Sequence, residues 1–326
     1  MSDYVMAAAE PGGPEVFVKR EVTVGEPGPG QARVRHTAVG LNYLDTYHRS
    51  GLYPWPVRGN LVAGSEAAGV VEAVGEGVTG VAVGDRVAYT HPYDAYASAR
   101  LIPADRLVKI PEGVSDEEAA CAMLKGLTVH YLLHSTFPVT KDTVVLGHAA
   151  AGGVGLLMGQ WLAAIGATSI GTAGGPEKVA LAKANGWGTV IDTRAEDFVP
   201  RVIELTGGSK CHVVYDSVGR DTWRGSLACL RPRGMFVTFG QSSGVIEGFS
   251  IADLATVGSG FCTRPSLFHH ISTRAELEAR AAEMFALMAA GKLRIPVNQR
   301  VPLTEVAEAH RALEGRRTTG ATVLIP

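Results

Sequence analysis

The stretch that decides the fold is TVVLGHAAAGGVG, Thr143–Gly155, which leads through an apolar segment to a second glycine cluster, TAGG, at Thr172–Gly175. It starts as a short apolar β-run and passes into a glycine-rich turn. After the turn, apolar residues recur at helical spacing, at Leu157, Trp161, Leu162 and Ile165. A strand, a tight glycine turn and a helix in this order are typical of the opening unit of a nucleotide-binding α/β fold.

The turn itself reads AAGGVG, residues 150–155, which is the G-x-G-x-x-G pattern with alanine at the first glycine. Gly152 lets a pyrophosphate approach the backbone, Gly155 permits close packing of helix and strand, and the helix N-terminus supplies N–H donors. Taken alone, this degenerate pattern also fits a purely structural glycine turn. Its place between a strand and a helix favours the nucleotide. We therefore expect cofactor contacts at Gly152, Gly153, Val154 and Gly155.

An acidic residue is missing where NAD-binding proteins usually hold the adenosine ribose. In such proteins an Asp or Glu about 20 residues past the glycines accepts hydrogen bonds from the ribose 2′-hydroxyl. Here that place is filled by TAGG, and Lys178 follows at the start of the next predicted helix. A 2′-phosphate would meet no repelling carboxylate there, and Lys178 could pair with it. The sequence thus favours NADPH, although a lysine at this place can also be an ordinary solvated helix residue.

More short apolar β-runs follow, with amphipathic or Ala-rich stretches between several of them: SIGTA, TVID, HVVYDSVG and MFVTFG. Strands that alternate with helices predict a parallel, doubly wound sheet, which we place in residues 126–261. Ligands of such sheets lie across the carboxyl ends of the strands. Ser217 and the run Phe239, Gly240 and Gln241 close two β-runs and are candidate cofactor contacts. The alternative for both is a turn of small residues that lets the chain reverse.

The sequence on either side of this region has a different character. Residues 1–125 are rich in Gly, Pro and Val, with alternating runs such as QARVRHTAVG separated by turn dipeptides, so they predict a β-rich domain. In residues 262–326, a helical stretch is followed by the strand-like ending TVLI, a tail that can rejoin the first domain. The helical periodicity is carried by Leu277, Ala281, Met284 and Met288. We therefore expect an α/β protein of two domains.

Composition excludes several classes of partner. A net charge of −2, spread through the chain, argues against a nucleic-acid or membrane-surface protein, which needs concentrated positive charge. We find no signal-peptide pattern and no apolar run long enough for a membrane helix. The cysteines are scattered without any C-x-x-C pair, so neither a zinc knuckle nor a disulfide framework is indicated. We expect a small-molecule partner and a reducing, cytoplasmic location.

Several longer motifs resemble one family, and the similarity extends over essentially the whole chain. They are VGLNYLDTYHRSGLYP (Val39–Pro54), GSEAAGVV, GDRVAY, LKGLTVHYLL, AAAGGVG, VVYDSVG and TRPSL. Together they resemble the quinone oxidoreductases, the zeta-crystallin-like, zinc-free branch of the medium-chain dehydrogenase/reductase superfamily. The resemblance implies a GroES-like catalytic domain interrupted by a Rossmann domain, NADPH as hydride donor, and a homodimer joined through the Rossmann sheets.

The zinc-dependent members of that superfamily bind a catalytic metal with a Cys, the His of a G-H-E motif and a second Cys or an acid. They hold a structural metal with four clustered cysteines. This chain has Asn42 at the first position and Ser65 in GSE, and its cysteines are not clustered. Glu66 is retained, but one carboxylate and one amide make a poor zinc site. We expect no metal.

The resemblance also implies roles for individual residues. Asn42, Tyr47 and Tyr53 would lie near the nicotinamide or the substrate entrance, and Thr128 would face the cofactor. Other uses of these residues are common. Asn42 and Asp45 could cap a helix, and Tyr47 and Tyr53 could be core residues whose hydroxyls are hydrogen-bonded.

Two arginines and one departure from the family complete the expected site. Arg264 of TRPSL resembles a residue near the active cleft, and Arg316 of EGRRTTG matches an arginine that joins Lys178 on the 2′-phosphate. Some relatives place a tyrosine after the third strand, beside that phosphate, where this chain offers Asp192 and Thr193. An aspartate there would weaken the preference for a phosphate.

The expected reaction is metal-free hydride transfer from NADPH to a small quinone. A quinone, or an alkene conjugated to a carbonyl, already delocalises the incoming charge onto oxygen, so the loss of zinc agrees with such an acceptor. Asn42 or a tyrosine hydroxyl would hydrogen-bond the acceptor oxygen, and water would supply protons. Two alternatives remain open: a reductase of α,β-unsaturated carbonyls, and an NADPH-binding protein without catalysis.

Overall fold

The computed structural model describes residues 2–57 and 59–326, which divide into two compact units. Unit 1 comprises the residues up to Leu127 together with His270–Pro326, and unit 2 is Thr128–His269. The changes in sequence character at 125/126 and 261/262 lie a few residues before these borders. In the part of the chain that the structure describes, every helix is too short or too polar to cross a membrane.

Unit 2 is built on a six-stranded, parallel sheet in the order β11-β10-β9-β12-β13-β14. The strands are β9 (Val144–Gly147), β10 (Thr168–Ala173), β11 (Thr189–Asp192), β12 (Cys211–Asp216), β13 (Leu230–Thr238) and β14 (Phe261–Thr263). This confirms the predicted doubly wound sheet. The strand order reverses between β9 and β12, the place where such sheets bind nucleotides, and the glycine turn directly follows β9.

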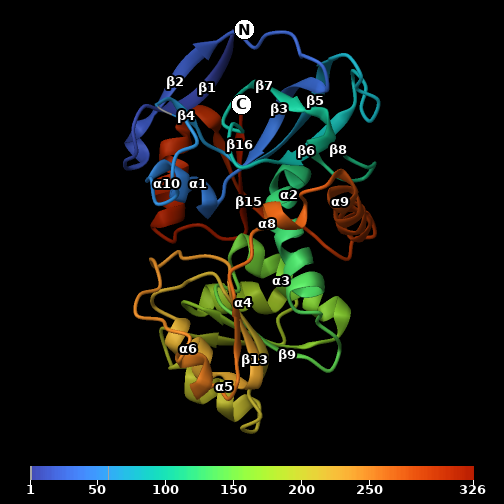
Figure 1. Cartoon of the computed structure of the whole chain (residues 1–326). Coiled ribbons are helices and arrows are strands. Elements are labelled where there is room, and N and C mark those ends of the chain that lie inside the picture. The colour runs from blue at the N-terminus through green and yellow to red at the C-terminus, as the bar shows by residue number, and fades with distance from the viewer. Residues whose placement is uncertain (1, 58) are drawn as a thin grey trace. The chain divides into compact units, whose positions relative to one another are not determined.

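Helices connect these strands, as Figure 1 shows in green to orange. They are α3 (Gly153–Ile165), α4 (Pro176–Ala184), α5 (Phe198–Leu205), α6 (Trp223–Ala228) and α7 (Asp253–Thr256). The border between the units falls within α2 (Asp116–Tyr131), which runs on into a π-helical turn, η3 (Leu132–Thr136), and within α8 (Leu267–His270). The core of the unit gathers residues from successive strands, among them Leu146, Ile170, Val214 and Phe236. Burial on both faces explains why its strands read as continuous apolar runs.

Unit 1 contains a seven-stranded sheet in the order β15-β16-β3-β5-β6-β8, with β7 paired to β3, and a three-stranded sheet in the order β2-β1-β4. The N-terminal strands are β1 (Asp3–Ala8), β2 (Phe17–Val22), β3 (Gln31–Gly40), β4 (Leu61–Val62), β5 (Glu66–Val74), β6 (Arg86–Thr90), β7 (Ala99–Pro103) and β8 (Val108–Lys109). The C-terminal strands are β15 (Val297–Pro302) and β16 (Ala321–Ile325). The helices and helical turns are η1 (Pro14–Val16), α1 (Tyr43–Arg49), η2 (Ala104–Arg106), α9 (Arg274–Ala289), η4 (Leu303–Glu305) and α10 (Val306–Glu314).

The C-terminal tail returns to the first unit, as predicted. Strand β16 pairs antiparallel with β3, with Val323 opposite Gly40 and Leu324 opposite Val39, and Figure 1 shows this red strand beside the blue one. Helix α9 starts with a capping box between Thr273 and Glu276. Its buried face includes the four residues predicted from helical spacing, Leu277, Ala281, Met284 and Met288.

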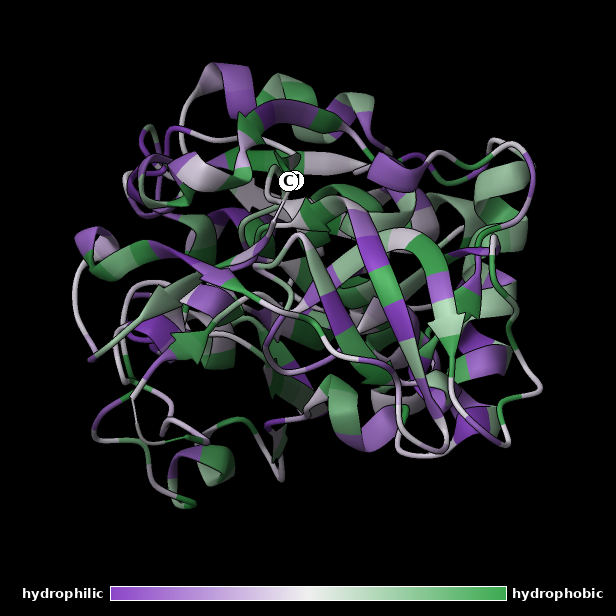
Figure 2. Cartoon of the chain, turned by 90° about the horizontal axis from the view of Figure 1, so that it is seen from above, coloured by the Kyte–Doolittle hydropathy of each residue, from purple (hydrophilic) through white to green (hydrophobic). Residues whose placement is uncertain are grey.

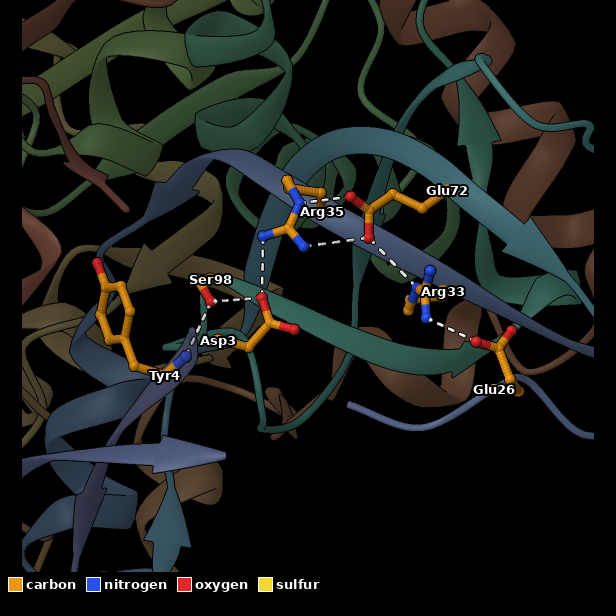
Figure 3. A network of polar contacts seen from close by, with 7 residues as sticks. All are labelled: Asp3, Tyr4, Glu26, Arg33, Arg35, Glu72 and Ser98. Atoms are coloured by element: carbon orange, nitrogen blue, oxygen red, sulfur yellow. Dashed lines mark hydrogen bonds and ion pairs between the residues drawn. The ribbon is translucent and has the colours of Figure 1, made fainter. Parts of the chain in front are cut away.

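The strands of unit 1 alternate between buried and exposed residues. In β3 the side chains of Ala32, Val34 and His36 are buried and their neighbours less so, and several strands in Figure 2 carry alternating hydrophobic and hydrophilic bands. On the outer side, Arg35 donates to Asp3 and Glu72 and so links β1, β3 and β5 (Figure 3). Exposed pairs of this kind contribute about 0–1 kcal/mol each. The buried face therefore sets the register of the strands, and the exposed ion pairs add little to the stability of the sheet.

Candidate functional site

The glycine turn after β9 presents backbone N–H groups at the start of α3. Gly152 is the N-cap residue, no side chain caps the helix, and the N–H of Leu156 makes a helical bond to the carbonyl of Gly152 at 2.9 Å. The N–H groups of the first turn of a helix have no partner within the helix. A Cβ on Gly155 would lie 2.3 Å from the carbonyl oxygen of Ala149, so glycine alone allows the helix to start this close to the turn. The arrangement fits the pyrophosphate of a dinucleotide.

A buried hydrogen-bond chain joins the carboxyl ends of β9, β10 and β12 beside this turn. Ser226 donates to a carboxylate oxygen of Asp216 at 2.8 Å, so its Oγ accepts from Nε2 of His148 at 3.0 Å. Nδ1 of His148 then accepts from the hydroxyl of Thr172 at 2.9 Å. Burial lowers the pKa of His148, and the nearby Asp216 carboxylate opposes this effect without outweighing it. Burial therefore favours the neutral imidazole. His148 thus links the strand ends around the turn.

The loops after β12 and β13 meet each other, and so bring together the predicted residues Ser217, Gly240 and Gln241. Asp216 accepts hydrogen bonds from the backbone N–H groups of Val218 and Gly219, which shapes the first loop. A Cβ on Gly240 would lie 2.7 Å from the carbonyl oxygen of Ser217. The small residues here therefore allow close packing of the two loops.

Arg264 directly follows β14 and lines an apolar pocket of unit 2. It donates to the carbonyl oxygen of Thr238 at 3.3 Å and to Oε1 of Gln241 at 3.3 Å. The pocket measures about 340 Å³, and its lining also includes Phe236, Val245, Ile246, Phe249 and Cys262. Three predicted residues, Gly240, Gln241 and Arg264, thus share a pocket whose walls are mainly apolar.

The turn between β10 and α4, where a ribose-binding carboxylate is missing, is held by a hydrogen bond to Asp192. Oδ1 of Asp192 accepts from the backbone N–H groups of Gly175 at 2.8 Å and Arg194 at 2.9 Å, and these bonds lower the pKa of Asp192. The guanidinium of Arg194 lies beside the turn, with Nη1 3.3 Å from the position that a Cβ on Gly175 would take. The carboxylate of Asp192 is therefore engaged by the backbone and faces a cation.

Arg194 is a residue that sequence reasoning missed, although its signal was present. It is the second residue after β11, in VIDTR, at the carboxyl end of a strand next to β10. Lys178 lies in the first turn of α4, so two cations belong to this end of the sheet. Arg316 is exposed and belongs to unit 1, and its contact with a 2′-phosphate stays a prediction. The same holds for Thr128, which is buried on α2.

In unit 1, Asn42 serves as the N-cap of α1, which confirms the capping interpretation. Its backbone N–H donates to Oδ2 of Asp45 at 2.8 Å in a reciprocal capping box. Its side-chain nitrogen donates to Oε1 of Glu66 at 2.9 Å and, more weakly, to the carbonyl oxygen of Gly40 at 3.4 Å. Both N–H groups of the Asn42 amide are thus directed at protein acceptors.

Glu66 is fully buried at the start of β5 and is held by three donors. Besides Asn42, the backbone N–H of Leu124 donates to Oε2 at 2.6 Å, and the ammonium of Lys125 donates to Oε1. Burial works to lower the pKa of Lys125, but the Glu66 carboxylate outweighs it and leaves the pKa above its ordinary value. The result is a buried, charged pair.

These residues do not fit a zinc ion. The ammonium of Lys125 contacts the carboxylate oxygen that a metal would need, and the amide of Asn42 turns its N–H groups toward Glu66. Ser65, at the position of the histidine in the zinc-binding motif, donates its hydroxyl to Oδ1 of Asp45 at 2.6 Å. A cation and committed donors replace the tetrahedral N, S and O ligands that zinc requires.

Asp45 connects this cluster to the C-terminal helix of unit 1. Tyr96 donates to Oδ2 of Asp45 at 2.9 Å and accepts from Nε2 of His310 at 2.9 Å, while Arg49 donates to Nδ1 of His310 at 3.0 Å. Burial raises the pKa of Asp45 to about 6 and lowers that of His310 to about 3. The network joins α1, which Asn42 caps, to α10.

The predicted residues Tyr47 and Tyr53 also come together in unit 1. Their ring centroids are 5.3 Å apart, and the backbone N–H of Tyr53 donates to the carbonyl oxygen of Tyr47 at 3.0 Å. Tyr47 is buried on α1, and Tyr53 is half-buried in the loop after it. Tyr47 and Tyr53 thus form a pair, and Tyr47 lies on the helix that Asn42 caps; the role of all three toward a substrate stays a prediction.

Comparison with known proteins identifies the family. Residues 28–112 match the alcohol dehydrogenase GroES-like domain, and residues 185–324 match the zinc-binding dehydrogenase family model. The chain is 50% identical over 316 residues, 97% of both chains, to the quinone oxidoreductase of Pseudomonas aeruginosa. The chain belongs to the quinone oxidoreductases. It is also 46% identical over 331 residues, 99% of both chains, to the 2-haloacrylate reductase of a Burkholderia species.

Solved structures of quinone oxidoreductases have the same fold. The enzyme of Pseudomonas syringae matches with a TM-score of 0.97 and 47% identity over all of both chains. The Escherichia coli quinone oxidoreductase, solved as a complex with NADPH, matches with a TM-score of 0.95 and 45% identity over all of both chains. These findings confirm the family resemblance and the predicted pairing of a GroES-like domain with a Rossmann domain.

Proposed function

We propose that this chain reduces quinones with NADPH as the hydride donor. The observation that carries this function is the match over the full chain to a quinone oxidoreductase whose structure holds NADPH. The glycine turn at the reversal of strand order supports it, because its uncapped N–H groups suit a pyrophosphate. The chain is an NADPH-dependent quinone oxidoreductase.

Residues of the Rossmann domain, 126–261 by sequence, would hold the cofactor. We assign the pyrophosphate to the backbone of Gly152, Gly153, Val154 and Gly155. Lys178 and Arg194 lie at the turn expected to meet the 2′-phosphate, and Arg316 remains a further candidate. Ser217, Phe239, Gly240, Gln241 and Thr128 are assigned to the rest of the cofactor. The engagement of Asp192 by backbone N–H groups supports NADPH, because that carboxylate does not have to face the phosphate.

The catalytic domain, residues 1–125 and 262–326 by sequence, would receive the acceptor. The chemistry that NADPH supplies when bound is a hydride, and the quinone that accepts it becomes a hydroquinone monoanion and takes up one proton from water. Tyr47 and Tyr53 are aromatic residues suited to a flat ring. Asn42 directs both amide N–H groups at Glu66 and Gly40, so a tyrosine hydroxyl is the better candidate donor to the acceptor oxygen. We also assign Arg264 to the surroundings of the reacting groups, on the family resemblance of TRPSL.

A reductase of conjugated alkenes is a second candidate. It is favoured by the 46% identity to a 2-haloacrylate reductase, whose named substrate carries an alkene next to a carboxylate. An enone, like a quinone, delocalises incoming charge onto oxygen, so one metal-free site suits both. The chemistry of the acceptor therefore has to be tested directly.

Steady-state oxidation of NADPH and NADH, each with 1,4-benzoquinone and with an enone, tests the proposal. We expect saturable oxidation of NADPH by the quinone and a higher KM for NADH. Turnover with the enone alone would replace the first function by the second. Saturable NADPH binding without oxidation by any acceptor would favour the non-catalytic alternative, and absence of saturable binding would reject all three.

The assembly and location follow as parts of the same proposal. Strand β14 is at the edge of the unit 2 sheet, and Phe261 on this strand is 55% exposed, which supports a homodimer that pairs the two Rossmann sheets. The cysteines are free thiols, as expected for a reducing cytoplasm.

A further inference from the structure

A buried ammonium group lies next to Asn42 and has unused hydrogen-bonding capacity. The side chain of Lys125 is 6% exposed. Its Nζ donates to Oε1 of Glu66, the same oxygen that accepts from Nδ2 of Asn42, so the two nitrogens are neighbours around one atom. An ammonium carries three donors. Within residues 2–57 and 59–326, Glu66 is its one hydrogen-bond acceptor, which leaves donors available beside Asn42.

The surroundings keep this charge in place. Glu66 is fully buried and held by the backbone N–H of Leu124 as well as by Asn42, so its carboxylate cannot turn away. Other acidic groups nearby are Asp45, which bonds to Ser65 and Tyr96, and the thiol of Cys121, whose pKa burial raises to about 12. The thiol is therefore neutral. A fixed cation in a buried place acts more strongly on a neighbouring charge than one in water.

We propose that Lys125 supplies the positive charge that stabilises the anionic oxygen of the acceptor during reduction, and that Glu66 is a positioning residue that holds this ammonium beside Asn42. The inference rests on the proposed function, because it takes Asn42 as a neighbour of the acceptor. The quinone gains a hydride, with its two electrons, as NADPH becomes NADP⁺. The resulting hydroquinone monoanion carries its charge on oxygen until water gives it a proton. The Asn42 amide lacks spare N–H groups for that oxygen, whereas Lys125 has them.

The competing explanation is a structural ion pair that ties α2 to β5. A structural pair affects folding but does not distinguish an anionic ligand from a neutral one. A stabilising charge does distinguish the two ligands, because it favours the ionised form of a bound phenol over the neutral form. Substituted phenols are suitable probes, since a phenolate resembles the hydroquinone monoanion.

The first experiment measures binding of 4-nitrophenol to the NADP⁺-saturated protein over a pH series, by the absorbance of the phenolate. We expect the wild type to bind phenolate more tightly than neutral phenol. Lys125→Met should lose about tenfold or more of the phenolate affinity and none of the affinity for the neutral form. Lys125→Arg should retain most of the preference. Lys109→Met, which removes an exposed lysine paired with Asp85, is the matched control and should behave as wild type.

The second experiment measures kcat/KM for a series of benzoquinones of graded electron demand. Loss of the charge should lower kcat/KM most for the electron-rich quinones. In Lys125→Met, kcat/KM should therefore depend more steeply on the electron demand of the quinone, while the KM for NADPH stays unchanged. An equal slowing of every quinone, with an unchanged phenolate preference, would overturn the proposal in favour of a structural pair.

A variant that removes one partner of a buried pair can fail to fold, because the other charge is left alone. The double variant Lys125→Met with Glu66→Gln removes both charges and keeps a polar group at position 66. We expect it to fold and bind NADPH but to show no preference for phenolate. If it kept the wild-type preference, Lys125 would not be the source. Failure of the proposed function is distinguishable, because the wild type would then reduce neither quinone nor enone while the phenol titration still reports on the ammonium.

Discussion

Asp192 and Arg194 are two residues apart at the end of β11, and their backbone contacts determine how this turn receives an anion. A carboxylate at this position, considered alone, weakens a phosphate site. The structure shows that Oδ1 of Asp192 is used by the N–H groups of Gly175 and Arg194. The guanidinium of Arg194 lies beside Gly175, near the start of α4. The side chain that faces the turn is thus a cation that suits bidentate pairing with a phosphate.

Substitution of Arg194 tests this arrangement. Arg194→Gln should raise the KM for NADPH by about tenfold or more, since a hydrogen bond to a charged group contributes about 1.5–3 kcal/mol. The KM for NADH, which has no 2′-phosphate, should not change. Arg201→Gln, which removes an exposed arginine of α5 paired with Glu204, serves as control in the same steady-state assay. Equal effects on both coenzymes, or no effect, would place Arg194 outside the phosphate site.

At the residue scale, the sequence predicted the glycine turn, the role of Asn42 as a cap and the loss of zinc ligands, because each depends on local chemistry. It did not predict the partners of these residues. Glu66 and Lys125 are far apart in the chain and meet only because β5 and α2 pack together. The direction of the Asp192 side chain depends on backbone geometry that no residue pattern reports.

At the scale of elements, the strands and helices with clear periodicity were predicted and the short ones were not. The five apolar β-runs of the Rossmann domain correspond to β9 through β13, and the buried face of α9 is as expected. Strand β14 has three residues, too few to show a period, and its place comes from pairing of Cys262 with Phe236. Strand β15 alternates between half-buried and exposed residues and lacks an apolar signal.

The start of α3 provides a prediction at this scale. A Cβ at position 155 would lie 2.3 Å from the carbonyl oxygen of Ala149, so Gly155→Ala has to shift the first turn of the helix away from β9. We expect NADPH affinity to fall by about tenfold or more, because the N–H donors move from the pyrophosphate. Isothermal titration with NADPH measures this, and circular dichroism checks that the helix content is kept. Gly80→Ala, where a Cβ meets nothing within 4 Å, is the control. Unchanged affinity would show that the turn does not bind the cofactor.

For the whole molecule, the exposed edge of the Rossmann sheet leads to a prediction about assembly. Phe261→Asp places a charge on β14 and should convert the proposed homodimer to a monomer, because a buried unpaired carboxylate opposes association. Light scattering coupled to size-exclusion chromatography measures the mass. Val83→Asp changes an exposed apolar residue of unit 1 that is 63% exposed and should leave the mass as in wild type. A wild-type chain that elutes as a monomer would contradict the proposal.

The architecture of the whole molecule was predictable because the change from alternating β-runs to strand–helix repeats is visible along the chain. The family motifs then supplied the GroES-like identity of the first unit. The sequence alone could not show how much the first unit depends on its last residues. That dependence arises from pairing between β3 and β16, whose residues are almost three hundred positions apart.

This pairing has a consequence for synthesis on the ribosome. All six strands of the Rossmann sheet lie in one continuous segment, which is translated before β15 and β16. In the nascent chain the first domain therefore still lacks β16, and Val39 and Gly40 lie at an unpaired strand edge. The inserted domain can fold before this edge is paired. The first domain can close only after β16 has been translated, so a product that terminates before β16 keeps this edge unpaired and exposed to aggregation.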